Sequence, residues 1–281
     1  MNSINKYLIN DQSLIDSFSK HAKSYDRYAQ LQKSMAERMA SLLPVPLPDY
    51  VLEIGCGTGL FTRHLLTQPI RQLILIDIAP GMLEILSSSL SLPENTKIIS
   101  GNAERIEFEN MGLICANAVF QWFQKPQETL KKLIQALKGN GKLIFSTFGP
   151  RTLVEFREAA NLASPIDLYK NEIWTKMIHN AGFAIKNCDV EIRKIFFPVS
   201  DLPVSPSFNK YCHSRLFPFH LDHSDIEYPS IKFNSGFWNV IKSSSPSKLY
   251  ALPDSPLRSA TNVAPFTVPL FPFPLSSLAL P

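Results

Sequence analysis

The chain has 281 residues, of which 45% are hydrophobic and 19% are charged, so it can bury a full core as one large domain or as a domain with an appendage. Its net charge of +4 is too small to indicate a nucleic-acid partner, although it suits an acidic protein partner. The four cysteines are scattered and form no CxxC pair, which argues against a disulfide framework and a structural zinc site. A reducing compartment, the cytoplasm, is the plain interpretation.

Neither end of the sequence predicts a membrane segment. The first twelve residues are polar and lack the apolar core of a signal peptide. Residues 263–281 carry no charge and are almost long enough to span a bilayer. Each proline in that stretch removes a helical hydrogen-bond donor, so we expect no spanning helix there. The interrupting prolines are Pro265, Pro269, Pro272 and Pro274.

Residues 1–43 are predicted to be helical and to form an N-terminal unit. Apolar side chains recur there at helical spacing, at Leu14, Ile15, Phe18, Ala22 and Tyr25. Three prolines between residues 44 and 48 then make a short, stiff break before the next unit begins.

From residue 44 to 197, strand-like and helix-like stretches alternate. The expected strands lie at 50–54, 72–78, 97–100, 113–119, 142–148 and 184–197. The expected helices lie at 59–66, 80–90, 125–137, 151–162 and 169–180, with Gly139-Asn140-Gly141 closing the third. Such alternation predicts an α/β fold, with a doubly wound, Rossmann-like, mostly parallel sheet and helices on both faces.

Residues 198–281 differ in character and are predicted to form an irregular C-terminal tail rich in proline and serine. They hold 13 of the 22 prolines, 15 serines and only one of the 11 glycines. No apolar period of 2 or 3.6 is sustained there. Two explanations stay open. The tail is an irregular or disordered extension, or the reading frame has slipped near residue 200 and replaced the natural C-terminal domain.

The strongest motif follows the first expected strand, which carries Glu53 and ends in Gly55, Gly57 and Gly59. Glycines let the backbone turn sharply and approach a ligand without a Cβ in the way. The helix that follows offers free N–H groups to an anion. The dinucleotide fingerprint requires a third glycine where Leu60 stands, so a pyrophosphate is not expected. Alone, the loop could also be an ordinary strand–helix turn.

Three further features follow successive expected strands. Asp77 can accept both hydroxyls of a ribose, and Met82 can lie along an adenine ring, although Asp77 alone suits a helix N-cap equally well. Asn102, beside Ala103, can accept the adenine amino proton, although a lone asparagine here is more often a turn residue. The third feature is the segment that begins at Asn117, at the end of the fourth expected strand. Because ligands bind at the carboxyl ends of strands in open α/β sheets, all three should meet in one crevice.

These motifs resemble those of class I S-adenosylmethionine-dependent methyltransferases in order and approximate spacing. The segments are EIGCGTG (53–59), LIDIAPGML (75–83), SGNAE (100–104) and NAVFQW (117–122). Within that superfamily the chain is most similar to the malonyl-[acyl-carrier protein] O-methyltransferases of biotin synthesis. The similarity is carried by FSKHAKSYDRYAQLQ (18–32), NAVFQW, GKLIFSTFGPRTLVEFRE (141–158) and IHNAGFAIKNCDVEI (178–192). It covers roughly residues 15–197. Asn102 departs from the more frequent aspartate, and nothing after about residue 200 matches.

The resemblance implies methyl transfer from S-adenosyl-L-methionine to the free carboxylate of a malonyl thioester, carried by acyl-carrier protein or as malonyl-CoA. That carboxylate is already ionised at neutral pH, so neither a general base nor a metal is expected. The cofactor-binding residues would be Glu53, Gly55, Gly57, Gly59, Asp77, Met82, Asn102, Ala103 and Asn117. Acceptor-side candidates are Tyr25, Gln121 and Trp122, with core packing as the alternative for Tyr25 and Trp122.

The resemblance also implies that residues 1–43 form a helical lid over the cofactor in 44–197. Four basic residues on this lid could meet an acidic carrier protein, with a solvated helix face as the alternative. They are Lys20, Lys23, Arg27 and Lys33. Two other functions stay open: methylation of another small carboxylic acid such as trans-aconitate, and cofactor binding with impaired catalysis because of the aberrant C-terminus.

Overall fold

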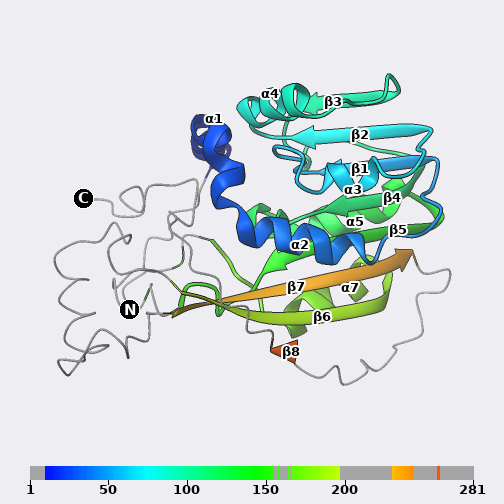
Figure 1. Cartoon of the computed structure of the whole chain (residues 1–281). Helices are drawn as coiled ribbons and strands as arrows, with labels where there is room; N and C mark the ends of the chain where they lie inside the picture. The colour runs from blue at the N-terminus through cyan, green and yellow to red at the C-terminus, as the bar shows by residue number, and fades with distance from the viewer. Residues whose placement is uncertain are drawn as a thin grey trace, which may run out of the picture.

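The computed structural model describes residues 10–154, 157, 164, 166–196, 230–242 and 258–259 (Figure 1). Its helices are α1 (Asp11–Tyr28), α2 (Gln30–Ala40), α3 (Thr62–Leu65), α4 (Pro80–Ser89), α5 (Pro126–Ala136) and α7 (Asn171–Ala181), with a 3-10 turn η1 (Phe120–Trp122). Its strands are β1 (Tyr50–Ile54), β2 (Gln72–Asp77), β3 (Thr96–Ser100), β4 (Met111–Ala116), β5 (Leu137–Phe148), β6 (Phe183–Phe196), β7 (Ser230–Lys242) and β8 (Arg258–Ser259).

The described strands form one sheet in the order β3-β2-β1-β4-β5-β7-β6-β8. The five strands from β3 to β5 pair in parallel, whereas β7 runs antiparallel to both of its neighbours. The predicted mostly parallel, doubly wound sheet is therefore confirmed. The chain builds outward from β1 to β3 and then returns to place β4 on the other side of β1. Such a reversal leaves a crevice at the carboxyl ends of the strands.

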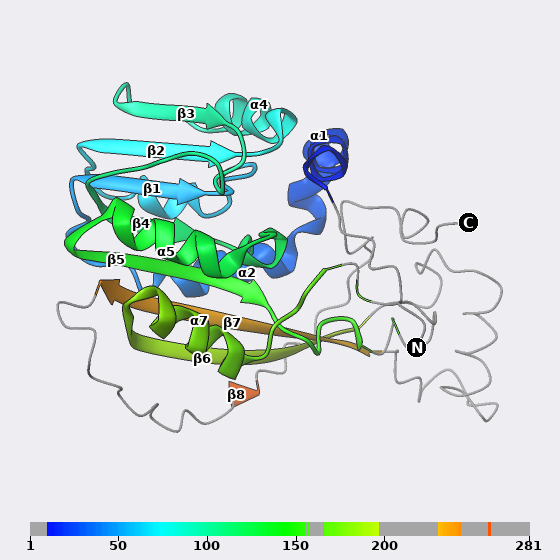
Figure 2. The same ribbon diagram turned by 180° about the vertical axis from the view of Figure 1, so that it is seen from behind.

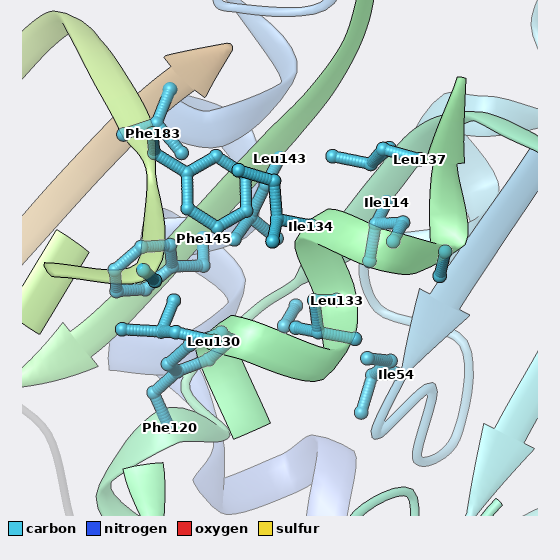
Figure 3. Close-up of a cluster of buried hydrophobic side chains, with 14 of the residues drawn as sticks. Ile54, Ile114, Phe120, Leu130, Leu133, Ile134, Leu137, Leu143, Phe145 and Phe183 are labelled. Atoms are coloured by element: carbon cyan, nitrogen blue, oxygen red, sulfur yellow. The ribbon is translucent and has the colours of Figure 1, made fainter. Parts of the chain in front are cut away.

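Helices cover both faces of the sheet, as comparison of Figure 1 with the reverse view in Figure 2 shows. On one face, α2, α3 and α4 contribute Met35, Leu65 and Leu86 to a buried apolar cluster. On the other face, α5 and α7 contribute Leu130 and Trp174 to a second cluster, part of which appears in Figure 3.

The strands between these two clusters are apolar on both faces. Val51 belongs to the first cluster and its neighbour Leu52 to the second, because successive side chains of a strand point to opposite faces. This is why the central strands are continuous apolar runs rather than alternating ones.

The expectation of an irregular tail over 198–281 is wrong for β7. Residues 230–242 form a strand that lies between β5 and β6 and pairs with both along much of its length. Phe237 and Trp238 are 1% and 0% exposed and enter the two opposite clusters. A strand buried on both faces has no apolar period of 2, so its sequence lacks the alternation that predicts a strand. Apart from β7 and β8, the tail lies outside the described residues.

Smaller differences concern where elements begin and end. β5 begins at Leu137, so the expected loop at Gly139-Asn140-Gly141 is part of a strand whose register with β4 shifts there. Helix α3 is a single turn rather than the expected 59–66. Residues 1–9 and most of the helix expected at 151–162 lie outside the described residues.

Candidate cofactor site

A pocket opens at the carboxyl ends of β1, β2 and β4, beneath α1. Most of the residues proposed from the sequence line it, together with others that the sequence did not indicate. The lining is Asp11, Leu14, Phe18, Tyr25, Gln32, Ile54, Gly55, Gly57, Ile76, Asp77, Ile78, Met82, Gly101, Asn102, Ala103, Glu104, Asn117, Ala118, Val119, Gln121, Trp122, Phe123 and Phe148. Glu53 and Gly59 are absent from this set.

The loop after β1 contains three glycines whose backbones adopt the left-handed conformation. Gly55, Gly57 and Gly59 have φ angles of 66°, 55° and 91°, a region that other residues rarely adopt. A Cβ on Gly55 would lie 2.3 Å from a methyl group of Val119, and one on Gly59 would lie 2.5 Å from Leu90. A Cβ on Gly57 would meet no protein atom within 4 Å. Gly57 thus leaves open space at the pocket wall, whereas Gly55 and Gly59 permit close packing.

Asp77 joins this loop to the start of α4. One carboxylate oxygen accepts the Gly57 N–H at 2.8 Å, and the other accepts the Ala79 N–H at 2.9 Å. Burial raises the pKa of Asp77, and these backbone hydrogen bonds oppose the rise. Each carboxylate oxygen can accept a further hydrogen bond, so Asp77 can hold the loop and still bind a ligand hydroxyl.

Glu53 lies beneath the pocket and not in its wall. Its side chain is 1% exposed and accepts a hydrogen bond of 2.8 Å from the Thr62 hydroxyl. Burial raises the pKa of Glu53 from 4.5 to about 8, and the nearby Asp77 adds to the rise. Glu53 thus connects β1 to α3, which contains Thr62, a structural task that the motif alone did not distinguish from ligand contact.

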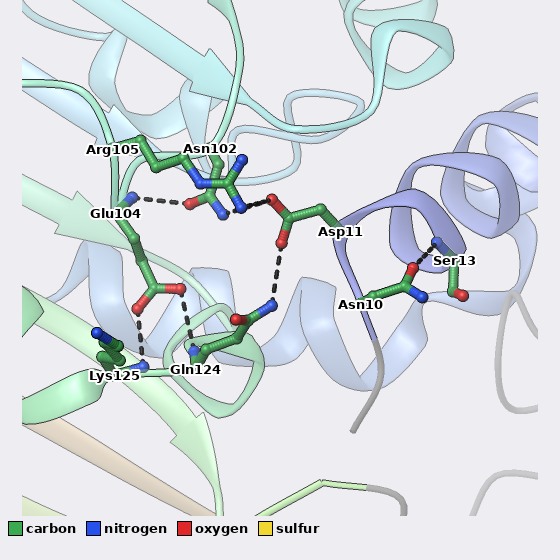
Figure 4. A network of polar contacts seen from close by, with 8 residues as sticks. All are labelled: Asn10, Asp11, Ser13, Asn102, Glu104, Arg105, Gln124 and Lys125. Carbon is green, nitrogen blue, oxygen red and sulfur yellow. Dashed lines mark hydrogen bonds and ion pairs between the residues drawn. The ribbon is translucent and has the colours of Figure 1, made fainter. Parts of the chain in front are cut away.

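Asn102 belongs to a polar network between the loop after β3 and the start of α1 (Figure 4). Its amide oxygen accepts the Glu104 N–H at 2.8 Å, and its amide nitrogen donates to Asp11 at 3.0 Å. The first contact is the turn geometry that was the alternative interpretation for Asn102. Asp11 also accepts from Gln124 at 3.1 Å and pairs with Arg105 at 2.8 Å.

Asn117 begins the opposite wall. Its amide oxygen accepts a hydrogen bond of 2.8 Å from Ser146, and its amide nitrogen donates to the Gln32 carbonyl at 3.0 Å. Gln121 is 4% exposed and accepts from the Thr147 hydroxyl at 3.1 Å. These contacts fix the polar side chains of this wall in place.

Aromatic rings close the pocket beneath α1. Phe18 packs edge-on against Trp122 and Tyr25, with centroids 5.6 Å and 6.2 Å apart. Burial raises the pKa of Tyr25, and the charges of Asp77 and Asp26 raise it further, so its hydroxyl stays protonated. Asp26 also accepts a short hydrogen bond from Thr58 in the glycine loop.

Several lining residues were not among the sequence candidates. Leu14 and Phe18 belong to the apolar stripe of the first helix, which the sequence revealed as packing rather than as a pocket wall. Asp11 gave no signal, because a lone aspartate near a helix start is usually a cap or a solvated residue. Among the described residues, no cluster of His, Cys, Asp and Glu could hold a metal ion. No described helix is long and apolar enough to cross a bilayer.

Comparisons with known proteins agree with this geometry. Residues 52–145 match the model of a methyltransferase domain. A malonyl-[acyl-carrier protein] O-methyltransferase of Halalkalibacterium halodurans is 38% identical over 168 residues, 56% of this chain and 62% of that protein. Malonyl-[acyl-carrier protein] O-methyltransferase 1 of Ilyobacter polytropus is 35% identical over 190 residues, 65% of this chain and 70% of that protein. The chain spans only 57% to 62% of the length of several such relatives.

Solved structures share the fold at low identity. A complex of the Haloferax volcanii Trm112 methyltransferase activator with a methyltransferase matches with a TM-score of 0.61 at 15% identity, covering 84% of this chain and 99% of that one. Magnesium protoporphyrin IX methyltransferase of Synechocystis, solved with bound S-adenosylhomocysteine, matches with a TM-score of 0.57 at 12% identity, covering 83% of this chain and 100% of that one.

Proposed function

Because the chain belongs to the malonyl-[acyl-carrier protein] O-methyltransferase family, we propose that it transfers a methyl group from S-adenosyl-L-methionine to the free carboxylate of a malonyl thioester. The product is a methyl ester, formed at an early step of biotin synthesis in the cytoplasm. One observation carries the proposal. A single pocket brings together the glycine loop, Asp77 and Asn102 on one side and Tyr25, Gln121 and Trp122 on the other.

The pocket fits the proposed methyl donor. Open space beside Gly57 leaves room for a ligand at the one loop glycine whose Cβ would meet no protein atom. Asp77 has acceptor capacity left for ribose hydroxyls, and Met82, 2% exposed, offers an apolar wall for adenine beside Asn102 and Ala103. Gly55 and Asn117 complete this side. We assign Glu53 and Gly59 to support of the loop instead of ligand contact.

On the acceptor side, the residues that line the pocket would position the malonyl carboxylate and exclude water from it. A malonyl carboxylate is ionised at neutral pH, so the sulfonium methyl group can be attacked without proton removal. Tyr25 is protonated and serves as a hydrogen-bond donor, not a base. Gln121 is already held by Thr147, and Trp122 packs against Phe18 above the pocket. Such groups align the reacting atoms and exclude water from them.

An acidic carrier protein is the proposed partner. Four basic residues are exposed on α1 and α2, the helices that also carry the pocket residues Tyr25 and Gln32: Lys20, Lys23, Arg27 and Lys33. These exposed charges would attract a negatively charged carrier to the helices that cover the pocket.

The decisive experiment is acceptor choice. Radiolabelled methyl transfer should run fastest with malonyl-acyl-carrier protein, more slowly with malonyl-CoA, and slowest with malonate or trans-aconitate. Asp77→Ala, which removes a proposed donor-side contact, serves as the inactive control. Faster transfer to a free acid would indicate that this chain methylates a small carboxylic acid instead of a malonyl thioester. Tight binding of S-adenosylmethionine with no transfer to any acceptor would indicate impaired catalysis.

A further inference from the structure

Asp11 at the first residue of α1 reaches across the pocket edge to the loop after β3. Its side chain is only 19% exposed, and it accepts hydrogen bonds from both Asn102 and Gln124. Figure 4 shows that Arg105 approaches the same carboxylate. The Arg105 side chain is 72% exposed, so solvent screens this ion pair more than the contact with Asn102.

Two contacts together fix which way the Asn102 amide points. A backbone N–H only donates, so the Glu104 N–H requires the amide oxygen on its side. A carboxylate only accepts, so Asp11 requires the amide nitrogen on the other side. If the amide turned over, its oxygen would face a carboxylate and its nitrogen would face an N–H.

We infer that Asp11 is a positioning residue that orients Asn102 for adenine recognition, and that the residue at position 11 decides which residue can stand at 102. The inference rests on the proposed function, because it assumes that the adenine amino group binds at Asn102. It also gives a physical reason for an asparagine at position 102 of this chain. An aspartate at 102 would bring a second carboxylate within 3.0 Å of Asp11.

The other charged groups nearby do not relieve that repulsion. The Glu104 carboxylate faces away, toward the backbone N–H groups of Gln124 and Lys125 at 3.0 and 2.9 Å. Arg105 already pairs with Asp11, and the Lys125 and Lys132 ammonium groups pair with Glu128 and Glu107. A charge at position 102 is therefore accepted only if position 11 becomes neutral.

A double-mutant cycle tests the inference, with affinity for S-adenosylhomocysteine measured by calorimetry. Asn102→Asp and Asp11→Asn should each weaken binding at least about fivefold. The double variant should return to within about twofold of the parent, because the new amide at position 11 can then donate to the new carboxylate at position 102. Asp16→Asn is the matched control on α1, where the carboxylate contacts only the exposed Gln12 among the hydrogen bonds described, and it should leave affinity unchanged.

A second ligand distinguishes orientation of the Asn102 amide by Asp11 from a general loosening of α1 in the Asp11→Asn variant. S-inosylhomocysteine carries an oxygen in place of the adenine amino group, so it gains nothing from a correctly placed amide oxygen. Asp11→Asn should therefore weaken binding of the adenine ligand more than binding of the inosine ligand. Equal losses for both ligands, or additive losses in the double variant, would overturn the inference. A parent chain that binds neither ligand would instead overturn the proposed function, and the inference with it.

Discussion

Three carboxyl groups near the pocket have three different environments. Asp77 is half-buried and receives two backbone hydrogen bonds, which stabilise its charge. Glu53 is buried with one hydroxyl partner, so its neutral form is favoured. Asp11 is paired with a cation and two amides. Their different tasks follow from the donors around each group and could not be distinguished by residue type.

Replacing Asp77 should weaken cofactor binding. Asp77→Ala removes the proposed ribose acceptor and frees the Gly57 N–H, so we expect the dissociation constant for S-adenosylmethionine to rise at least about tenfold. Calorimetric titration measures this, with the exposed Glu94→Ala as a control that should bind like the parent. Unchanged affinity in Asp77→Ala would remove this residue from the site.

Glu53 should make stability depend on pH. Its folded pKa of about 8 lies above the ordinary value of 4.5, so the folded state holds the proton more tightly than the unfolded state. The resulting stability is fully present below about pH 4.5 and is lost as the pH rises through 8. Glu53→Gln keeps a partner for Thr62 but cannot ionise. Urea unfolding at pH 5 and pH 8 should therefore show a smaller loss in Glu53→Gln than in the parent, and equal losses would contradict the assignment.

Among the elements, the strands that carry ligand-side loops were predictable, whereas β7 was not. β1, β2 and β4 are apolar runs that end in glycine or in small polar residues, and both signals are local in the sequence. The turn role of Asn102 and the support role of Glu53 depend on Glu104, Thr62 and their backbone positions, which the motif does not encode. β7 is flanked by proline-rich sequence and is buried on both faces, so composition concealed it.

Trp238 tests the place of β7 in the sheet. Its ring stacks on Phe145 with centroids 6.1 Å apart, and its side chain is fully buried. Trp238→Ala should lower the free energy of unfolding by about 3–5 kcal/mol. Denaturant unfolding measures the loss, and Val45→Ala, at a side chain 85% exposed, should change stability little. Parent-like stability in Trp238→Ala would show that residues 230–242 do not form the core strand.

For the whole molecule, the net charge of +4 is modest, so attraction of an acidic partner depends on where the basic residues lie. Replacing Lys20 and Lys23 together with glutamate reverses the basic face of α1 without touching a pocket residue. We expect the KM for malonyl-acyl-carrier protein to rise several-fold, and more at low salt, because steering of an acidic partner is lost. The KM for malonyl-CoA, assayed in parallel, should change less. Equal changes for both acceptors would place the carrier elsewhere.

The position of β7 also determines when the sheet can be completed during synthesis. Among the described strands, β6 bonds only to β7 and β8, so residues 183–196 leave the ribosome well before their partners exist. Until residues 230–242 have emerged, β5 is an edge strand whose unpaired backbone N–H and C=O groups invite pairing with another chain. A nascent chain of this protein therefore passes through a long, aggregation-prone interval, and chaperones that cover this open edge until β7 is complete would protect its yield.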